Sequence, residues 1–371
     1  MESNGVKWVR FGDYIEQCDE RNTASCNYPV IGINRDKTFM PTVANLDGVD
    51  IAKYKIVSKG MFVFSGMQTG RDICIRIGLY DKDQPALISP AYTTFFINKE
   101  NDVLPEYFFM YFNRDESDRY GWFISDSSVR ANLDWPRFLD IEIPLPSVAE
   151  QQKVVNAWRA FREIKEQNEA KAAPLMQLCQ SYIQELKHKY PMQEIGPYIH
   201  RIDERNTDNK IKEVRSVSVS KNFNATNAKV DKNNLSNYKI VRENQISFVQ
   251  TTGNEKCLCA AINHLGFPIV VTSVNEVFET DEKYLLADYL HLIFRRTETD
   301  RYARFNSWGS ARETFTWEDM TRFAIPLPSI EVQQAIVNIY KCANEAKQIA
   351  EEADRLSREV CPALFQHVIH S

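Results

Sequence analysis

The sequence predicts an α+β protein with two homologous domains joined and separated by a pair of long antiparallel coiled-coil helices. Three observations lead to this fold class. Short motifs recur in the same order, β-like runs fill the first part of each copy, and a long amphipathic stretch ends each copy. We therefore divide the chain into a first domain, a first helix, a second domain and a second helix, at residues 1–146, 147–190, 191–328 and 329–371.

The chain is one module written twice. Asp-Glu-Arg-Asn-Thr occurs at 19–23 and 203–207, and Tyr-Lys-Ile-Val at 54–57 and 238–241, both at the same offset. Asp-Arg-Tyr, at 118–120 and 300–302, and Ile-Pro-Leu-Pro-Ser, at 143–147 and 325–329, recur at an offset that is only slightly shorter. Because the offset hardly changes along the module, chance is a poor explanation, and the period is longer than that of any solenoid repeat.

Each copy begins with short runs that are rich in β-branched and aromatic residues and bounded by turn residues, a pattern typical of strands. The predicted strands are 61–64, 72–77 and 93–97 in the first copy, and 245–249 and 268–272 in the second. A short helix is expected at 106–113, with its counterpart at 287–295. This mixture indicates a compact α+β domain.

A long helix follows each globular region. Ser147 and Glu150 fit a capping box at the first helix start, whereas the second copy keeps Ser329 but has Val332 at the third position. Apolar residues then recur at alternating spacings of four and three, which predicts a coiled-coil seam. The seam runs through Val154, Trp158, Phe161, Lys165, Asn168, Ala172, Leu175, Cys179, Tyr182 and Leu186, and through Ile336, Tyr340, Ala343, Ala346, Ala350, Ala353, Leu356, Val360 and Leu364.

Two further expectations concern these helices. Pro174 and Pro362 lie inside them, and an interior proline predicts a bend or a break. A helix of about 40 residues is roughly 60 Å long, more than one turn of duplex DNA at about 34–36 Å. Paired antiparallel helices of this length could therefore hold two domains over separate DNA segments. Alternatively, the helices only dimerise the chain or pack on their own domains.

Composition excludes some classes of function. The net charge is −5, and residues 191–328 hold 18 basic and 18 acidic residues, so the chain has no basic clamp of the kind that holds DNA through phosphates alone. No run of apolar residues is long enough to span a membrane, and we see no signal peptide. The eight cysteines are scattered, which predicts reduced thiols in a cytoplasmic protein.

The duplicated pattern resembles the specificity subunit of type I restriction-modification systems. The resemblance is carried by Ile-Pro-Leu-Pro-Ser with the following Gln151-Gln152 or Gln333-Gln334, and by a Thr-Gly loop after a strand at 68–70 and 251–253. It covers nearly the whole chain. It implies two target-recognition domains that each read half of a bipartite sequence in double-stranded DNA, and long helices that set the gap between the half-sites. It also implies two methyltransferase subunits that carry S-adenosylmethionine, motor-nuclease subunits that use ATP, and no cofactor, metal or catalytic residue in this chain.

Base reading needs Arg, Lys, Asn or Gln side chains on loops that reach the groove edges. The predicted DNA-reading residues are Gln68, Thr69, Gly70, Arg71, Ser128, Arg130 and Asn132 in the first domain, and Lys221, Thr251, Thr252, Gly253, Asn254, Lys256, Ser310 and Arg312 in the second. For partner subunits we expect contacts from Trp158, Phe161, Tyr182, Tyr340 and Leu356 on the helices. Trp135 and Trp317, at matching positions, favour packing over DNA stacking.

The sequence offers little for catalysis. It has neither a P-loop nor the glycine-rich and Pro-Pro-aromatic motifs of a methyltransferase, and its six histidines show no metal-ligand spacing. We interpret the repeated Asp-Glu-Arg-Asn-Thr as a structural turn rather than an acid–base site. Two alternatives stay open: a self-dimerising scaffold with duplicated binding domains, and a nuclease that uses the acidic cluster at 279–283, with Asp281 and Lys283.

Overall fold

The computed structural model describes residues 6–67, 72–126, 131–226, 229–251, 257–309 and 313–370. The chain forms two compact units, one made of residues 1–167 and 349–371, the other of residues 168–348. Each long helix therefore contributes one half to each unit. Among the described residues, no helix combines the length and apolarity that crossing a membrane requires.

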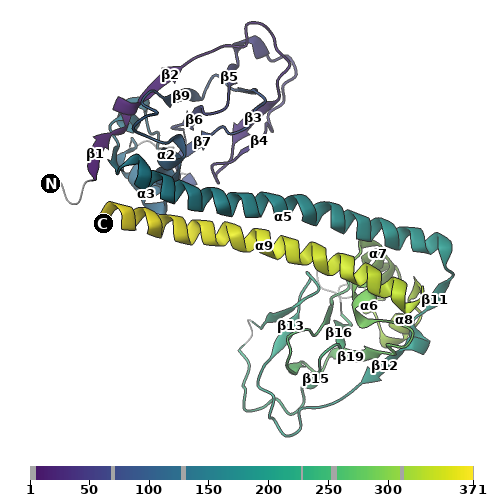
Figure 1. The fold of residues 1–371 in the computed structure, drawn as a ribbon. Helices are drawn as coiled ribbons and strands as arrows, with labels where there is room; N and C mark the ends of the chain where they lie inside the picture. Colours follow the sequence, from purple (N-terminus) through teal and green to yellow (C-terminus); the bar gives the residue numbers. More distant parts are fainter. Residues whose placement is uncertain are drawn as a thin grey trace. The chain divides into compact units, whose positions relative to one another are not determined.

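The globular part of the first unit is a mixed assembly of short strands and helices (Figure 1). A 3-10 turn, η1 (Phe11–Tyr14), follows the first strand, and a second, η2 (Ile51–Lys53), precedes β5. Its strands are β1 (Lys7–Arg10), β2 (Ile15–Cys18), β3 (Val30–Ile33), β4 (Phe39–Pro41), β5 (Lys55–Val57), β6 (Phe62–Ser65), β7 (Arg76–Leu79), β8 (Ala86–Ile88), β9 (Thr93–Ile97) and β10 (Glu142–Leu145). Its helices are α2 (Pro105–Phe112), α3 (Asp115–Ile124) and α4 (Trp135–Leu139).

The second unit repeats the strands and α-helices of the first in the same order. A 3-10 turn, η3 (Gly196–Tyr198), again follows the first strand. Its strands are β11 (Met192–Glu194), β12 (Ile199–Ile202), β13 (Arg215–Val217), β14 (Phe223–Ala225), β15 (Lys239–Val241), β16 (Ile246–Val249), β17 (Ala260–Ile262), β18 (Ile269–Val271), β19 (Asn275–Thr280) and β20 (Ala324–Pro326). Its helices are α6 (Ala287–Phe294), α7 (Thr297–Phe305) and α8 (Trp317–Thr321).

The sheets of the two units correspond strand for strand. In the first unit an antiparallel sheet has the order β2-β9-β6-β7, and its counterpart in the second is β12-β19-β16-β17. A second sheet, β4-β3-β8-β5, contains one parallel pair, β3 with β8. In the second unit it is divided into β13-β14 and β15-β18, which a parallel bridge between Val214 and Val270 connects. The predicted duplication therefore holds at the level of topology.

Most of the predicted elements are confirmed, and one strand is not. The expected strands at 61–64, 93–97, 245–249 and 268–272 and both short helices lie within one residue of observed elements. The strand expected at 72–77 begins only at Arg76. Ile73 has φ 48°, a left-handed backbone that interrupts an extended run and that a β-branched residue rarely adopts.

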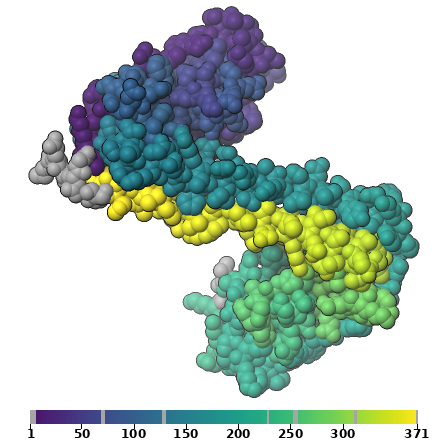
Figure 2. All heavy atoms as spheres, viewed as in Figure 1, coloured from purple at the N-terminus to yellow at the C-terminus, as the bar shows by residue number. Residues whose placement is uncertain are grey.

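Two long helices follow the globular parts, α5 (Val148–Lys189) and α9 (Ile330–His370), and they lie against each other within each unit (Figures 1 and 2). In the first unit Lys165 of α5 pairs with Asp354 of α9 at 2.7 Å. In the second, the Cys179 thiol donates to the Ile336 carbonyl at 3.8 Å. The residue order makes the pairing antiparallel, and together these features confirm the predicted fold class.

The seam of α9 is built from small residues. Ala343, Ala346, Ala350 and Ala353 are each 1–7% exposed. Small side chains let two helix backbones approach closely, so these alanines fit the predicted seam. The expected break at the prolines does not occur, because α5 runs through Pro174 and α9 through Pro362. An interior proline costs a helix about 3 kcal/mol.

Each globular core includes side chains from both long helices. In the first unit Phe11 is fully buried, and its ring lies 5.1 Å from those of Phe108 and Phe112. Trp158 of α5 and Phe365 of α9 belong to this core. In the second unit the corresponding contributions are Ile183 and Leu186 from α5, and Ile336 and Val337 from α9. The long helices are thus fixed to the globular parts and are not separate rods.

Candidate nucleic-acid interface

Two loops in each copy contain the predicted DNA-reading residues. Loop A joins β6 to β7 (66–75) and, in the second copy, β16 to β17 (250–259). Loop B joins α3 to α4 (125–134), and in the second copy α7 to α8 (306–316). The structure describes both ends of every loop. The geometry of these ends shows how the loops are held.

Backbone hydrogen bonds tie loop A to loop B at their bases. In the first unit the Leu133 N–H donates to the Gly66 carbonyl at 2.9 Å, and in the second the Phe315 N–H donates to the Gln250 carbonyl at 2.8 Å. The backbones of loops A and B lie so close here that only glycine fits at position 66, because a Cβ on Gly66 would lie 1.8 Å from the Leu133 backbone oxygen. Thr251 also bridges to Thr314. The sequence alone did not indicate that the two loops of a domain leave the core side by side.

Loop B is closed at its base in both copies. The Asp126 N–H donates to the Asn132 carbonyl at 3.0 Å, and the Trp308 N–H donates to the Thr314 carbonyl at 3.2 Å. These two pairs are related by the same offset as the repeated Asp-Arg-Tyr motif. The Asp126 carboxylate accepts a further hydrogen bond from the Asn132 N–H at 3.0 Å. The segments that these hydrogen bonds close, 126–132 and 308–314, therefore have the same length in both copies.

Only three of the predicted DNA-reading residues lie in the part of the chain that the structure describes. Asn132 is half-buried at the base of loop B, and Thr251 is exposed at the base of loop A. The third, Lys221, is corrected below. The others lie outside the described residues: Gln68, Thr69, Gly70, Arg71, Ser128, Arg130, Thr252, Gly253, Asn254, Lys256, Ser310 and Arg312.

Lys221 cannot read bases, and its assignment is corrected. The residue is 5% exposed. Its ammonium pairs with Asp300 at 2.7 Å and donates to the Phe294 carbonyl at the end of α6. Lys37 occupies the same place in the first unit, where it pairs with Asp118 at 2.8 Å and donates to the Phe112 carbonyl. The two lysines are separated by the same offset as the Asp-Glu-Arg-Asn-Thr motifs, and this signal in the sequence could have revealed their structural role.

The residue at the start of loop A differs chemically between the two units. Gln250 of the second unit donates to Glu276 at 2.7 Å, where the first unit has Gly66. Glu276 is buried and also pairs with Arg201 at 2.6 Å and Lys239 at 3.3 Å. Burial alone would raise the pKa of Glu276, but these two cations bring it below its ordinary value. The second domain thus has a charged network beneath its loops.

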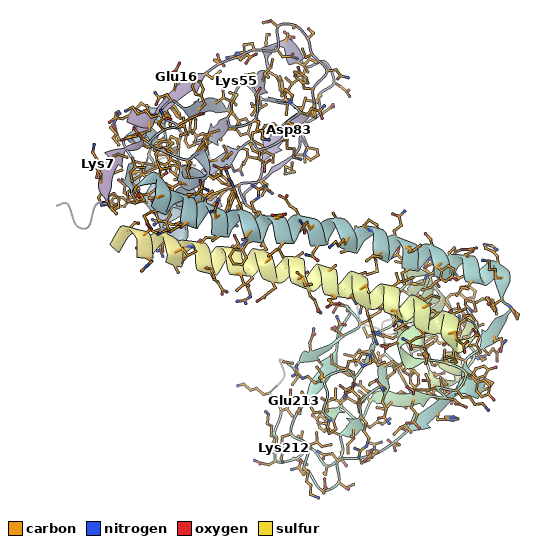
Figure 3. All side chains as sticks on the ribbon, viewed as in Figure 1. Lys7, Glu16, Lys55, Asp83, Lys212 and Glu213 are labelled. Atoms are coloured by element: carbon orange, nitrogen blue, oxygen red, sulfur yellow. The ribbon has the colours of Figure 1, made fainter. Side chains whose placement is uncertain are left out.

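The repeated motifs have structural roles, as predicted for Asp-Glu-Arg-Asn-Thr. The Arg21 guanidinium donates to the Lys53 carbonyl at 2.8 Å, and Arg205 donates to the Asn237 carbonyl at 2.9 Å. Asp19 pairs with Lys55, which Figure 3 labels, at 3.0 Å. The Arg21 and Lys55 cations lower the pKa of Asp19. The motif therefore joins the end of β2 to the Tyr-Lys-Ile-Val strand.

The Pro-Ser-x-x-x-Gln helix starts are equally structural. Gln151 and Gln333 are both fully buried. The Gln333 amide donates to the carbonyls of Tyr284 at 2.8 Å and Pro328 at 2.9 Å, and its oxygen accepts from the Leu286 N–H at 2.9 Å. Gln151 makes the same three hydrogen bonds with Asp102, Pro146 and Leu104, each at 2.9 Å. These amides fix the direction in which each long helix leaves its domain.

Four of the five residues expected to contact partner subunits pack on the cores of the chain itself. Trp158 is 9% exposed, and its ring lies 5.8 Å from that of Phe109. It leaves little surface for a partner, so this assignment is corrected. Phe161 packs on the first core and Tyr182 and Tyr340 on the second, while Leu356 is half-buried. Among the described residues, the long helices also expose apolar side chains outside the predicted set, namely Val148, Ile164, Leu178 and Ile349.

Trp135 and Trp317 pack as predicted. The Trp135 ring lies 5.4 Å from Phe95 and 5.5 Å from Phe138, and the Trp317 ring lies 5.7 Å from Phe278. Both are half-buried against the cores.

The acidic cluster considered for a nuclease forms a turn. The Asp281 carboxylate accepts from the Lys283 N–H at 3.1 Å, and its carbonyl accepts from Tyr284 and Leu285 at 2.9 Å each. Within the described ranges, no group of three or more His, Cys, Asp or Glu side chains could hold a metal ion. All eight cysteines are free thiols.

The fold and loops define a class of protein: a chain with two copies of one loop-presenting domain, each fixed to a pair of long helices. Among solved structures, the chain is similar to the S subunit of the type I restriction-modification system from M. genitalium, with 11% sequence identity, a TM-score of 0.66, and coverage of 99% of this chain and 97% of that one. This similarity shows that the two chains share a fold.

Two further structures match over similar lengths with lower TM-scores. One is a chain from a type I R-M system complex, with 13% identity, a TM-score of 0.43, and coverage of 98% of this chain and 99% of that one. The other is the HsdS subunit from Thermoanaerobacter tengcongensis, with 14% identity, a TM-score of 0.38, and coverage of 99% and 97%. No protein-family model matches the sequence, and no curated protein matches it.

Proposed function

We propose that this chain is the sequence-specificity subunit of a type I restriction-modification complex. Each domain reads one half of a bipartite site in double-stranded DNA. The long helices set the gap between the half-sites and dock methyltransferase subunits. Catalysis belongs to partners: the methyltransferase subunits bind S-adenosylmethionine, and a motor-nuclease subunit uses ATP. We place the complex in the cytoplasm.

The observation that carries this proposal is the duplicated pair of loops. Loops A and B leave each domain side by side, joined by one backbone hydrogen bond at the same place in both copies. Two adjacent loops can present several side chains to consecutive base edges, as direct readout of the major groove requires. The loops differ in sequence between the copies, so the two half-sites are expected to differ.

The charge balance explains why partners are needed. Non-specific DNA affinity comes largely from phosphate contacts by Lys and Arg. This chain has a net charge of −5, so it supplies little of that affinity. The methyltransferase subunits must provide most of the phosphate contacts, and this chain supplies the choice of sequence.

The decisive experiment is a domain exchange in the assembled complex. The chain is copurified with its methyltransferase subunits, and methylated adenines are mapped across a genome. Residues 191–328 are then replaced by the corresponding domain of another such subunit. One half-site should change and the other should stay. A complex that methylates without sequence preference, or an exchange that alters both half-sites, would refute the proposal.

A further inference from the structure

A buried lysine–aspartate pair lies beneath loop A in both units. Lys37 and Asp118 form it in the first unit, and Lys221 and Asp300 in the second. The lysine side chains are 5% and 7% exposed, and the aspartates 17% and 24%. A buried ion pair is weak evidence of stabilisation, since apolar residues of similar volume often serve as well. Its presence in both copies calls for another explanation.

Each pair joins four separate segments of the domain. The lysine lies at the tip of the β3–β4 hairpin or of its counterpart, β13–β14. Its ammonium donates to the last carbonyl of α2 or α6, where a cation is favourable at the negative end of the helix dipole. The aspartate lies in the first turn of α3 or α7, where an anion is favourable.

The fourth segment is the return end of loop A. The Asp118 carboxylate accepts a hydrogen bond from the Ile75 N–H at 2.8 Å, directly before β7. The Asp300 carboxylate accepts one from the Leu258 N–H at 3.0 Å, shortly before β17. In each domain, one carboxylate oxygen therefore binds both the buried ammonium and the backbone where loop A rejoins the sheet.

The backbone at the hairpin tips indicates that the lysine side chain itself is needed. Lys37 has φ 61° and Lys221 has φ 62°. A left-handed backbone favours glycine or asparagine, and other residues adopt it at an energetic cost. The five-residue tips 34–38 and 218–222 share only this lysine when aligned at the repeat offset. Lysine is thus present in both copies at a place where the backbone favours smaller residues.

We infer that Lys37 with Asp118, and Lys221 with Asp300, are positioning residues for sequence reading: each pair holds the return end of its own loop A in the geometry that reads one half-site. This inference rests on the proposed function. An apolar pair could fill the same volume but could not accept the backbone N–H. Recognition requires loops held within fractions of an ångström, so losing this contact affects discrimination more than folding.

The test uses the full chain in complex with its methyltransferase subunits. The double variant Lys221→Met/Asp300→Leu removes both charges and keeps apolar volume in the core. Amide hydrogen exchange at 257–260 should become at least about tenfold faster, while exchange in β16 and β19 stays slow. Discrimination against single-base changes should fall about tenfold in one half-site and stay unchanged in the other.

The duplication supplies the matched control. Lys37→Met/Asp118→Leu should relax only the other half-site. Asp300→Asn keeps an acceptor for the Leu258 N–H but loses the attraction to Lys221, so its effect should lie between wild type and the double variant. If the double variant does not fold, hydrogen exchange and base discrimination measured on Asp300→Asn test the inference instead.

The inference would be overturned if these variants kept wild-type discrimination between bases and wild-type protection of loop A from hydrogen exchange. It would also be overturned if discrimination fell equally at both half-sites. Failure of the proposed function is a different result. In that case the wild-type complex itself shows no base discrimination.

Discussion

Replacing Gln333 by leucine tests whether a buried amide fixes the start of α9. The change removes three hydrogen bonds and leaves the Leu286 N–H and the carbonyls of Tyr284 and Pro328 without this partner. Each buried group left unsatisfied costs about 1–3 kcal/mol. Because partial relaxation lowers the sum, we expect a loss of about 3–5 kcal/mol in the free energy of unfolding of the second unit.

The neighbouring residue provides the control. Gln334 is exposed and donates to Asn338 at 2.9 Å. Gln334→Leu should change stability by less than about 0.5 kcal/mol. Urea unfolding of the full chain, followed by hydrogen exchange in β16 and β19 to isolate the second unit, measures both variants. An equal loss of stability from the two substitutions would refute the role given to Gln333. The same comparison can be made in the first unit with Gln151→Leu and Gln152→Leu.

Further predictions concern the helices and their contacts. Ala350→Leu should destabilise the chain by about 1–3 kcal/mol in thermal unfolding, because Ala350 is 3% exposed in the seam, whereas Ala335→Leu at an exposed position should have little effect. Hydrogen bonding to Asp288 raises the pKa of His264 in the folded protein. The stabilisation by the protonated imidazole is therefore complete below the pKa of the unfolded state and is lost as pH rises through the pKa of the folded state. The unfolding midpoint of the wild-type chain should fall between pH 6 and pH 8.5, and a similar fall in His264→Gln would contradict this. Four residues inserted after Gln167, matched by four before Ile349, lengthen each helix by about 6 Å and should widen the gap between methylated half-sites; an unchanged gap would exclude the helices as the ruler.

Acid should also weaken the contact between α6 and α9. Burial would raise the pKa of Asp288, but hydrogen bonds from His264 and Lys341 lower it to about 2. A carboxylate with a depressed pKa stabilises the fold above its unfolded value near 3.8 and loses that contribution as pH falls toward 2. Asp288→Asn should remove this part of the acid dependence, which unfolding curves between pH 2 and 5 would reveal.

The sequence was sufficient for features that depend on order and periodicity. The motif offsets predicted two domains of equal topology, and the seam predicted which alanines of α9 are buried. Lys221 was misassigned because its partners, Asp300 and the end of α6, are far away in the sequence. A lysine beside Asn222 on a turn resembles an exposed cation until the tertiary contacts are known. Trp158 was misassigned for the same reason, since α2 covers it through Phe109.

Pro174 shows a different limit of local reasoning. Helix propensity predicts a bend or a break there, yet α5 continues without a break to Lys189. Tertiary packing of residues such as Cys179 and Ile183, which are 2% exposed, overrides the local preference. The joined bases of loops A and B also required the structure, because no spacing in the sequence indicates that Gly66 meets Leu133.

The division of the compact units has a consequence for biosynthesis. The first unit includes residues 349–371, and the ring of Phe365 stacks on that of Tyr107 at 4.8 Å. A ribosome completes Tyr107 long before it reaches Phe365, because the whole of the second globular part is translated between them. The amino-terminal lobe must therefore wait, with part of its apolar interior uncovered, until the second lobe has been made.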